Sequence, residues 1–547
     1  MFEAKEQIDV PLKDVFSWYF EDSKVEPDAP IYIDASDDNR YYTLNSARKT
    51  IRQLVAGLRH LGVQKGDVVT IHSFNDIDFP ILVNGIVASG AIFSGTNPGY
   101  LQHELAHAIR TAVAKYIITE PEMLQTVLQA AEITGLPREN ILVFDHYEKQ
   151  AIPSGFDSWR SLLSHGEEDW VRLSKPEECK TTIIARLFSS GTTGLPKVAQ
   201  FTHYNFIAQH IQTNDWKPKP YLQRKLIPVP MFHVAVVPSM HFSPLKSGVK
   251  IFIMRRFELE TYLQNVEKYK ITEMTTVPPM VVAMINSNLM KKHNFSSVKH
   301  ITCGAAPLKK EPQARLTALI NKDAIFTQVW GMTETTCVAT NFPYPETDST
   351  GSVGRPLPGM DIKLVDDNGN DITGYGVRGE LCIRGPTVIS GYLDAKATAD
   401  SWDSDGFFHT GDIAYCEEET GKWYIVDRKK ELIKVRGFQV APPELEGVLL
   451  SHENIVDAAV IGVDIPGTNS ELPRAYIVRR QGIKEQDLTD ESVKQYMAER
   501  LSKFKRLDGG VVFVEEIPKN PSGKILKRVL REMAAEEIKK ESRTSKL

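Results

Sequence analysis

The side chains best suited to chemistry lie in one short segment, Ser189 to Lys197, with the sequence SSGTTGLPK. It follows the apolar run Thr182 to Phe188, which predicts a strand. The hydroxyl groups and glycines of such a loop can direct O–H and backbone N–H donors at a polyphosphate, and Lys197 adds a positive charge. The spacing is not that of a P-loop, which disfavours a P-loop ATPase or kinase. The predicted phosphate-binding residues are Ser189, Ser190, Gly191, Thr192, Thr193, Gly194 and Lys197.

Further segments with reactive or metal-binding side chains follow along the chain. Taken singly, each has an ordinary explanation: a lone glutamate such as Glu334 is usually at the surface, and Asp412 after a glycine is typical of a turn. A lone histidine among apolar residues, such as His233, is usually a satisfied core residue. Their order along the chain is more informative. The segments are GAAPL (304–308), QVWGMTE (328–334), TGD (410–412), DRKKELIK (427–434), RGFQV (436–440) and PKNPSGKILK (518–527).

In this order, from Ser189 to Lys524, the segments resemble the adenylate-forming superfamily of acyl-CoA synthetases, adenylation domains and beetle luciferases. The chain is most similar to the branch that holds 4-coumarate–CoA ligase and fatty acyl-CoA synthetases. It departs from the family pattern at Val198, where a small residue usually follows the lysine, and at Trp330, where tyrosine is usual. The resemblance implies that the protein uses ATP and Mg²⁺, with coenzyme A as co-substrate.

The resemblance also implies that Thr333 contacts phosphate, that Glu334 holds Mg²⁺, and that Asp412 binds the ribose hydroxyls with help from Arg428. Carboxylates suit these tasks, because Mg²⁺ prefers hard oxygen ligands and a diol can donate hydrogen bonds to a carboxylate. The aromatic face of Trp330 suits a purine ring. The implied nucleotide- and coenzyme-binding residues are Gly304, Ala305, Ala306, Trp330, Gly331, Met332, Asp412, Arg428 and Gly437.

By the same resemblance, Lys524 is the catalytic lysine, which would neutralise the charge that develops as the acid displaces pyrophosphate. Lys430 matches a hinge about which a small domain would rotate between two half-reactions. After that rotation, Lys434, Gly437 and Gln439 would lie nearest to the groups that form the thioester.

The acyl pocket is also implied by family position, with His233 at its mouth. Val329 occupies a place where glycine is common, and its branched side chain would narrow one wall. We therefore expect a medium-chain fatty acid or an aryl or arylalkanoic acid as substrate, and not necessarily a 4-coumarate-like one. The expected lining residues, most of them small, are Ala235, Ser239, Gly304 to Ala306, Val329, Cys337 and Val338.

Alternating helix-like and strand-like patterns must position these segments. Amphipathic runs such as Asn45 to Leu61 alternate with short apolar runs such as Tyr116 to Thr119, which predicts a mostly parallel sheet covered by helices. From Asp361 onward, closely spaced strands predict a β-rich subdomain with a hairpin turn at Asn368-Gly369.

After Asp427 the pattern changes to a basic run and then to a βαβ-like unit that ends in a charged helix. The expected fold class is therefore α/β: a large N-terminal domain of helix-covered sheets with a β-rich subdomain, and a small mobile α+β C-terminal domain. We expect residues 1–427 to bind ATP and the acid, and residues 428–547 to carry the catalytic lysine.

Composition excludes several classes of protein. A net charge of -5 from 65 basic and 70 acidic residues, with no long block of one sign, argues against nucleic acid as a partner. The five cysteines form no CxxC or Cys/His pair, which predicts a reducing compartment without structural zinc. The most apolar segment, Phe79 to Gly95, is too short to span a bilayer, so no integral membrane contact is expected.

The last residues, Ser545, Lys546 and Leu547, form the tripeptide that the peroxisomal import receptor reads at a free C-terminus. The first ten, MFEAKEQIDV, lack the charged start and apolar run of a secretory signal. We therefore expect the peroxisome as location and its import receptor as partner.

The motifs together predict an ATP-dependent ligase that converts an acid to an acyl-adenylate and transfers the acyl group to coenzyme A. One alternative is another acceptor, either a carrier protein or oxygen as in luciferases. Against these, the chain has no carrier domain, and PMFHVAV (230–236) lacks the pattern associated with luciferases. The other alternative is a nucleotide- or acyl-binding protein without turnover, which would not need Lys524.

Overall fold

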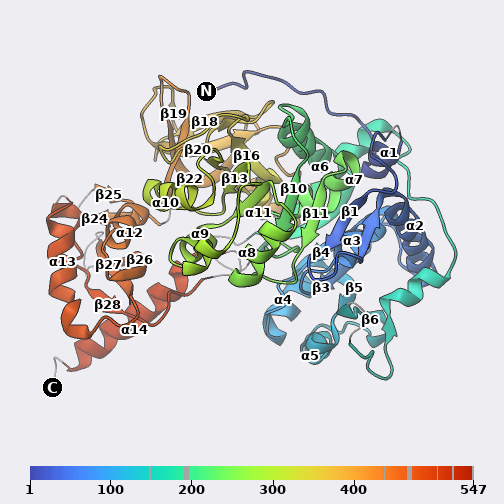
Figure 1. The fold of residues 1–547 in the computed structure, drawn as a ribbon, viewed down its shortest axis with the longest axis horizontal. Helices are drawn as coiled ribbons and strands as arrows, with labels where there is room; N and C mark the ends of the chain where they lie inside the picture. Colours follow the sequence, from blue (N-terminus) through green and yellow to red (C-terminus); the bar gives the residue numbers. More distant parts are fainter. Residues whose placement is uncertain are drawn as a thin grey trace. The chain divides into compact units, whose positions relative to one another are not determined.

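The computed structural model describes residues 1–547 except 22, 147–149, 190–195, 430, 436–437, 465–470, 502, 520–522 and 545–547. The chain forms two compact units, residues 1–362 with 383–409 and residues 363–382 with 410–547 (Figure 1). The fold is mixed α/β with a larger N-terminal and a smaller C-terminal part, as the sequence predicted. The boundary expected after residue 427 lies inside the second unit, so a movement at that point stays a prediction.

The first unit contains an eight-stranded sheet whose central strands are parallel, in agreement with the alternating sequence pattern. Only β9 and β21 at one edge run antiparallel to their neighbours. In sheet order the strands are β21 (Gly391–Tyr392), β9 (Lys197–Thr202), β8 (Ile183–Ser189), β4 (Ile92–Gly95), β3 (Val68–His72), β5 (Ala114–Thr119), β6 (Ile141–Val143) and β7 (Asp157–Ser158).

A seven-stranded sheet in the same unit is parallel except at β2. Its order is β14 (Ile325–Gln328), β13 (His300–Cys303), β12 (Glu273–Thr276), β10 (Arg224–Ile227), β11 (Lys250–Ile253), β1 (Pro30–Asp34) and β2 (Tyr41–Thr43). The carboxyl ends of parallel strands lie at one edge of a sheet, where ligands of open α/β folds bind. A separate three-stranded sheet follows: β15 (Trp330–Met332), β16 (Cys337–Asn341) and β17 (Arg355–Pro356).

Helices cover these sheets through apolar faces, and local signals mark their ends. Helix α2 (Leu44–His60) begins where the Thr43 side chain accepts a hydrogen bond from the Ser46 N–H, a cap worth about 1 kcal/mol. Helix α5 ends at Gly135, whose φ of 75° suits glycine. The other helices of this unit are α1 (Val15–Phe20), α3 (Asp78–Ala88), α4 (Gln102–Ala112), α5 (Leu124–Thr134), α6 (His203–His210), α7 (Ser243–Ser247), α8 (Leu259–Lys268), α9 (Pro278–Ile285), α10 (Lys310–Ile320) and α11 (Ala395–Ala399).

The second unit holds most of the predicted β-rich subdomain and the small α+β region. The hairpin expected at Asn368-Gly369 is present between β18 and β19, with Gly369 at φ 83°. The five-stranded sheet has the order β19 (Asp371–Ile372), β18 (Asp361–Val365), β20 (Gly379–Arg384), β22 (Phe408–Cys416) and β23 (Trp423–Arg428).

The C-terminal region contains the predicted βαβ unit, formed by β27 (Glu471–Arg479), α13 (Asp490–Ala498) and the parallel strand β28 (Val511–Phe513). Strand β26 (Ile455–Asp464) instead pairs antiparallel with β27. The remaining elements are β24 (Ile433–Val435), β25 (Phe438–Val440), α12 (Pro442–Leu450) and α14 (Lys527–Thr544).

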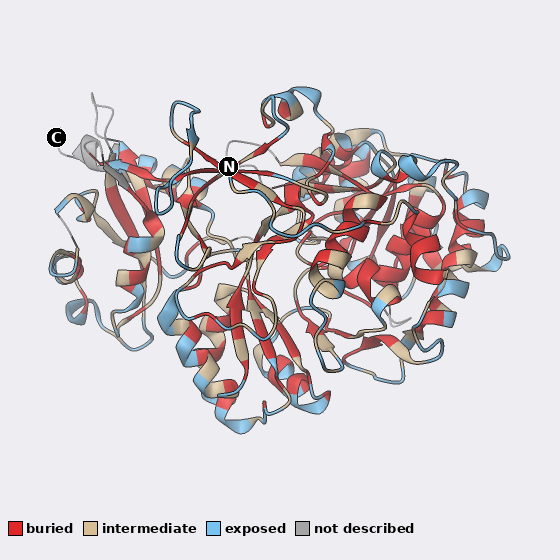
Figure 2. Ribbon diagram, turned by 90° about the horizontal axis from the view of Figure 1, so that it is seen from above, coloured by how far each residue is buried: buried red, intermediate tan, exposed pale blue. Residues whose placement is uncertain are grey.

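Buried residues, red in Figure 2, occupy most positions of the strands. Helices α1 and α3 are buried along their whole length, whereas helices such as α2 and α4 also carry exposed residues. Separate apolar clusters support the seven-stranded sheet and the C-terminal strands. Among the helices that the structure describes, none has the length and apolar character needed to cross a bilayer.

Candidate active site

The expected phosphate loop connects strands β8 and β9. Ser189 is the last residue of β8 and Lys197 the first of β9, and these two residues pair with each other in an antiparallel ladder. The phosphate-binding residues Ser190, Gly191, Thr192, Thr193 and Gly194 lie outside the described residues. Val198, where the sequence departs from the family pattern, is a buried position of β9 paired with Phe188.

Glu334 is the centre of the polar contacts beside this hairpin. Its side chain is buried, and its Oε1 accepts hydrogen bonds from Ser189 Oγ at 2.5 Å and from the Tyr392 hydroxyl at 2.6 Å. The Nζ atom of Lys197 lies 4.8 Å from the centre of the Tyr392 ring. Strands β8 and β21 therefore bring two hydroxyl donors to one carboxylate, and β9 places Lys197 against the ring of one donor, Tyr392.

This arrangement fits Mg²⁺. Among the described residues, the two side chains that donate to the Glu334 carboxylate, Ser189 and Tyr392, both use Oε1, so in this part of the chain Oε2 is open to a cation. Within the described ranges, no group of three or more His, Cys, Asp or Glu side chains could hold a metal. A single buried carboxylate suits Mg²⁺, which is usually bound by one or two carboxylates together with substrate phosphates and water. Thr333 precedes Glu334 in a short 3-10 turn and is also buried.

The two segments expected beside adenine leave the carboxyl ends of neighbouring parallel strands. Cys303 at the end of β13 pairs with Gln328 at the end of β14, so Gly304 and Val329 emerge side by side. The Gln328 amide accepts from the Leu308 N–H at 2.9 Å and donates to the Leu308 carbonyl at 2.8 Å, which ties the segments together. The structure thus brings Gly304, Ala305 and Ala306 to the strand edge that leads into Trp330.

Gly331 has a steric reason to be glycine. A Cβ atom at this position would lie 1.6 Å from the Cys337 carbonyl oxygen, across the β15–β16 pair. The neighbouring Trp330 is buried and Met332 is half-buried. No side chain can replace this glycine without moving the strand that leads to Glu334.

The residues expected to line the acyl pocket form close groups. A Cβ atom at Gly304 would lie 3.0 Å from Val329 Cγ2, so the valine side chain packs over the glycine. Cys337 Sγ lies 3.7 Å from the Ala235 carbonyl, and the Ala235 N–H donates to His233 Nδ1 at 3.2 Å. Nδ1 is therefore an acceptor, and in a neutral ring the proton sits on Nε2. The lining residues, which include Ser239 and Val338, are half-buried or exposed. Most of the residues next to them in the chain are buried.

In the second unit, Asp412 and Arg428 face each other across strands β22 and β23. The Arg428 Nε atom lies 3.1 Å from Asp412 Oδ1, and the two residues are paired in register. Thr410 Oγ1 accepts from the Asp412 N–H at 3.1 Å and donates to the Leu381 carbonyl at 2.6 Å. Gly411 between them has a φ of 71°. The carboxylate is thus held in one orientation, as ribose binding requires.

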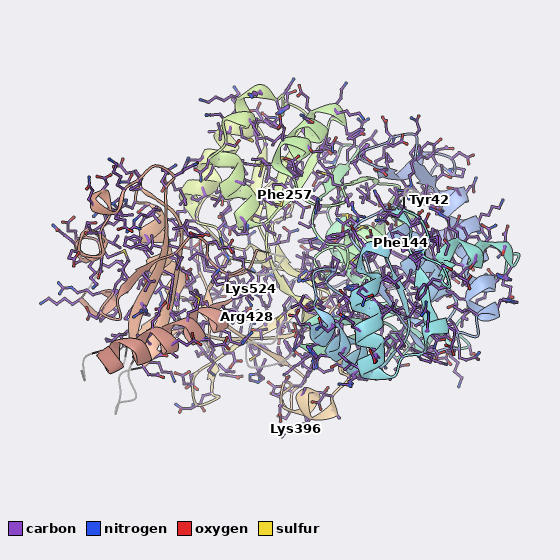
Figure 3. The ribbon with its side chains drawn as sticks, turned by 90° about the horizontal axis from the view of Figure 1, so that it is seen from below. Tyr42, Phe144, Phe257, Lys396, Arg428 and Lys524 are labelled. Atoms are coloured by element: carbon purple, nitrogen blue, oxygen red, sulfur yellow. The ribbon has the colours of Figure 1, made fainter. Side chains whose placement is uncertain are left out.

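Lys524 lies beside Arg428 (Figure 3). Burial is the main cause that lowers the pKa of Lys524, and the positive charges of Arg428 and Lys527 lower it further. Asp412 and Glu431 act in the opposite direction. The structure therefore groups the predicted catalytic lysine with the predicted ribose-binding pair.

The thioester-forming candidates are only partly described. Lys434 pairs with Gln439 across β24 and β25, and its N–H donates to Glu471 Oε2 at 2.8 Å. Gly437, the hinge residue Lys430 and the side chain of Gln439 lie outside the described residues. The roles given to these residues stay predictions.

The sequence analysis missed residues that contact the site but lie far from its motifs in the chain. Tyr392 holds Glu334 from a two-residue strand with no motif of its own. Gln209 Oε1 accepts from the Val338 N–H at 2.8 Å, and Gln328 was included only as a motif boundary. No local pattern identifies these residues, because their partners are distant in sequence.

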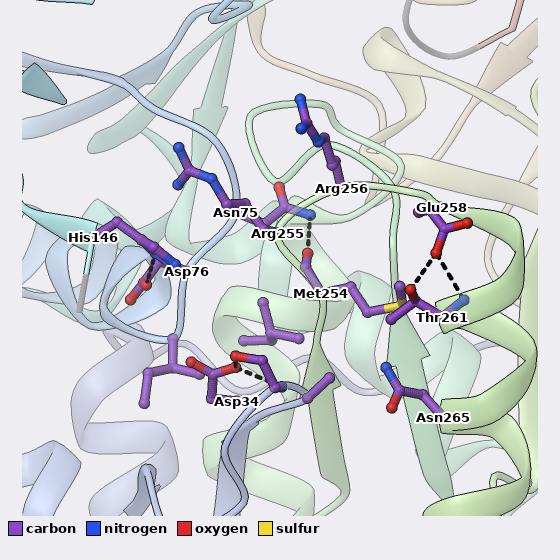
Figure 4. Close-up of a pocket in the computed structure, with 14 residues that line it drawn as sticks. Asp34, Asn75, Asp76, His146, Met254, Arg255, Arg256, Glu258, Thr261 and Asn265 are labelled. Carbon is purple, nitrogen blue, oxygen red and sulfur yellow. Dashed lines mark hydrogen bonds and ion pairs between the residues drawn. The ribbon is translucent and has the colours of Figure 1, made fainter. Parts of the chain in front are cut away.

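A cavity of about 180 Å³ elsewhere in the first unit contains none of the predicted site residues (Figure 4). Its walls include Asp34, Asp76, His146 and Arg255. These charges are paired mainly with nearby protein groups, for example His146 Nδ1 with Asp76 Oδ2 at 2.8 Å. We therefore do not assign the acid to this cavity.

Comparison with solved structures gives the fold. The ATP-bound structure of MatB from Rhodopseudomonas palustris superposes with a TM-score of 0.83 at 23% identity, over 96% of this chain and 99% of that chain. The anthranilate CoA ligase AuaEII in complex with anthranoyl-AMP gives 0.84 at 22% identity, over 97% and 99%. The fold is therefore that of adenylate-forming enzymes, as the motifs predicted.

Sequence comparison gives the family. Residues 19–393 match the AMP-binding enzyme family and residues 444–524 match the AMP-binding enzyme C-terminal domain, so the chain belongs to this family. Phenylacetyl-CoA ligase epaB of Aspergillus niger is 50% identical over 541 residues, covering 98% of this chain and 100% of that protein. The 4-coumarate–CoA ligase 4 of Arabidopsis thaliana is 34% identical over 535 residues, covering 95% and 91%.

Proposed function

We propose that this protein is an ATP-dependent acid–CoA ligase that forms an acyl-adenylate and then an acyl-CoA thioester. The observation that carries the proposal is the buried Glu334 carboxylate, held by Ser189 and Tyr392 at the base of the phosphate loop. Relatives that are 50% identical over nearly the whole chain are named phenylacetyl-CoA ligase and acyl-CoA ligase, which supports the same reaction.

Each group of residues has a task in the proposed reaction. Asp412 accepts hydrogen bonds from the ribose hydroxyls while Arg428 fixes its orientation. Glu334 would hold Mg²⁺, and a bound Mg²⁺ would neutralise part of the negative charge of the phosphates. Lys524 stabilises the negative charge that builds up when a carboxylate oxygen attacks the α-phosphorus and pyrophosphate leaves. The thiol of coenzyme A then attacks the acyl carbon, and AMP leaves.

We further propose an aryl or arylalkanoic acid as substrate, with a medium-chain fatty acid as the alternative class. The small residues at Gly304, Ala235 and Cys337 leave room for a ring or a chain, and Val329 packed over Gly304 restricts one wall. The name of the phenylacetyl-CoA ligase relative supports the arylalkanoic class.

The test is ATP–pyrophosphate exchange with short, medium and long fatty acids, phenylalkanoic acids and cinnamic acids, followed by addition of coenzyme A to the best acid. We expect exchange with a phenylalkanoic or medium-chain acid, and its thioester when coenzyme A is added. Exchange without thioester would indicate another acceptor, such as a carrier protein. No exchange with any acid would contradict the ligase proposal and favour a binding protein.

Replacing Val329 by glycine should broaden the range of accepted acids. The change removes the side chain that packs over Gly304, so bulkier rings should gain relative to small acids. We expect kcat/KM for a substituted cinnamic acid to rise about tenfold, which corresponds to the few methyl groups removed. An unchanged substrate profile, in a variant with unchanged Tm, would show that Val329 does not border the acyl group.

We also propose peroxisomal import through Ser545, Lys546 and Leu547, which lie outside the described residues. The proposal rests on the tripeptide alone and applies when Leu547 is the free C-terminus. A fluorescent protein fused to the N-terminus should give punctate fluorescence that overlaps a peroxisomal marker. Removal of the three residues should make it diffuse, and persistent overlap would contradict this address.

A further inference from the structure

A buried ion cluster in the second unit links the two sides of the predicted hinge segment. At the start of α14, Lys527 Nζ lies 3.3 Å from Glu446, 3.6 Å from Glu431 and 3.9 Å from Asp427. Asp427 belongs to β23 and precedes Lys430, the predicted hinge residue, whereas Glu431, Glu446 and Lys527 follow it in the chain. The side chains of Lys527 and Asp427 are only 6% and 7% exposed. The cluster therefore joins chain segments that a rotation at the hinge would separate.

The charges of this cluster do not balance, because one lysine faces three carboxylates. Asp427 Oδ2 is buried without a hydrogen-bond partner in the described structure, and Oδ1 accepts only the Arg428 N–H at 2.7 Å. Glu446 instead accepts the Val460 N–H at 3.0 Å, which stabilises its charge. Burial raises the pKa of Asp427 to about 7; Lys527 opposes this rise, and Glu431 and Glu446 add to it. Asp427 is therefore a carboxyl group whose protonated form is favoured by its surroundings.

The same lysine fixes the loop that carries Lys524. Lys524 and Lys527 lie in one segment, GKILK, at residues 523–527. The Leu526 N–H donates to the Pro518 carbonyl at 2.8 Å, which closes this loop at its base. A loss of the contacts of Lys527 would therefore release the loop from β23 and from Arg428 beside Lys524.

We propose that Lys527, Asp427, Glu431 and Glu446 form a proton-linked latch that holds Lys524 beside Asp412 and Arg428. Lys527 is its positioning residue. Rotation of the hinge segment opens the latch, exposes Asp427 to water and releases its proton to solvent. The role in alternation between half-reactions rests on the proposed ligase function.

The direction of the pH dependence follows from proton uptake. Water-exposed Asp427 has an ordinary carboxyl pKa near 4, and in the latch the pKa is about 7. The latched state therefore binds the proton more tightly. Its population relative to the open state falls about tenfold per pH unit as the pH rises from about 4 to about 7, and stays constant above that. The charged groups around Asp427 that affect its pKa are Lys527, Glu431 and Glu446, and the Arg428 N–H also affects it through its hydrogen bond.

The kinetic test measures both half-reactions between about pH 5.5 and pH 8, adenylate formation from ATP and acid and thioester formation from supplied acyl-adenylate and coenzyme A. Asp427→Asn is a permanently neutral mimic of the protonated latch. For each protein, the adenylation rate is divided by the thioester rate, and the wild-type value is then divided by the value for Asp427→Asn. This quotient should fall severalfold as the pH rises to about 7 and then level off. An equal pH dependence in both proteins would overturn the proposal.

A matched pair of lysines tests the positioning role. Lys527→Ala should lower adenylation at least about tenfold, since it leaves buried carboxylates unpaired, and Lys527→Arg should restore most of it. Lys519, in the same loop, pairs with Asp457 at 2.5 Å and is more exposed, so Lys519→Ala should change the rate less than about twofold. Equal losses in Lys519→Ala and Lys527→Ala would contradict the role of Lys527.

A readout without turnover separates this proposal from the ligase proposal. In unliganded protein, trypsin cleavage after Arg428 and Lys429 should become faster as the pH rises toward about 7, relative to a free peptide of the same sequence. Asp427→Asn should cleave at a pH-independent relative rate, and a wild-type rate without pH dependence would refute the latch. If cleavage depends on pH in this way but no acid supports ATP–pyrophosphate exchange, the latch proposal is supported and the ligase proposal is contradicted.

Discussion

Lys524→Ala should lose adenylate formation by ~10²- to 10³-fold, which is the usual effect of removing one preorganised donor from a developing charge. The same variant should still convert supplied acyl-adenylate and coenzyme A to the thioester, because that step breaks the bond between the acyl carbon and the phosphate oxygen and involves no attack on the α-phosphorus. The structure places Lys524 with Arg428 and Asp412, the residues expected at the ribose. The two half-reactions are measured separately, by ATP–pyrophosphate exchange and by thioester release.

The matched control is Lys519→Ala, which removes a lysine from the same loop but not from this group. It should retain both half-reactions. If Lys524→Ala lost both half-reactions equally, the loop would serve general folding or binding, and the assignment of Lys524 to the first step would be wrong. Thermal unfolding of each variant distinguishes that outcome from a loss of stability.

The second large effect is expected at Glu334. Glu334→Gln keeps an oxygen for Ser189 and Tyr392 but removes the negative charge. If this carboxylate holds Mg²⁺, adenylation should fall about 10²-fold, and part of the loss should be recovered at high Mg²⁺ because the cation site is weakened and not destroyed. Exchange rates measured across a Mg²⁺ titration provide the check.

Tyr392→Phe is the control for this prediction. It removes one hydrogen bond to Glu334 and leaves the carboxylate charged, so the expected loss is about fivefold. A Glu334→Gln variant with the same small loss and an unchanged Mg²⁺ requirement would contradict the metal role. The comparison separates the charge of Glu334 from its position.

The sequence predicted the architecture where periodic patterns were long and strong. The helix expected from Asn45 to Leu61 is α2, and the strand runs of the first unit form a mostly parallel sheet. Strand partners were harder to predict, because pairing depends on residues far apart in the chain. The antiparallel pairing of β26 with β27 is one such case.

The candidate site also contains residues that the sequence predicted and residues that it did not. Motifs located Ser189, Glu334, Asp412 and Arg428, and the structure brings these residues into two groups, one in each unit. Tyr392 was missed because it comes from a separate short strand. The cluster around Lys527 was also missed, because a lysine in a basic tail resembles a solvated charge until its buried carboxylate partners are known.

The most direct test of the account follows oxygen from the acid. The ligase is incubated with ATP, coenzyme A and its best acid carrying isotopically heavy oxygen in the carboxylate, and the AMP is analysed by mass spectrometry. An acyl-adenylate predicts one heavy oxygen in each AMP formed, because the carboxylate oxygen that attacks the α-phosphorus leaves with it. Unlabelled AMP, or label in inorganic phosphate together with ADP, would contradict the proposed reaction.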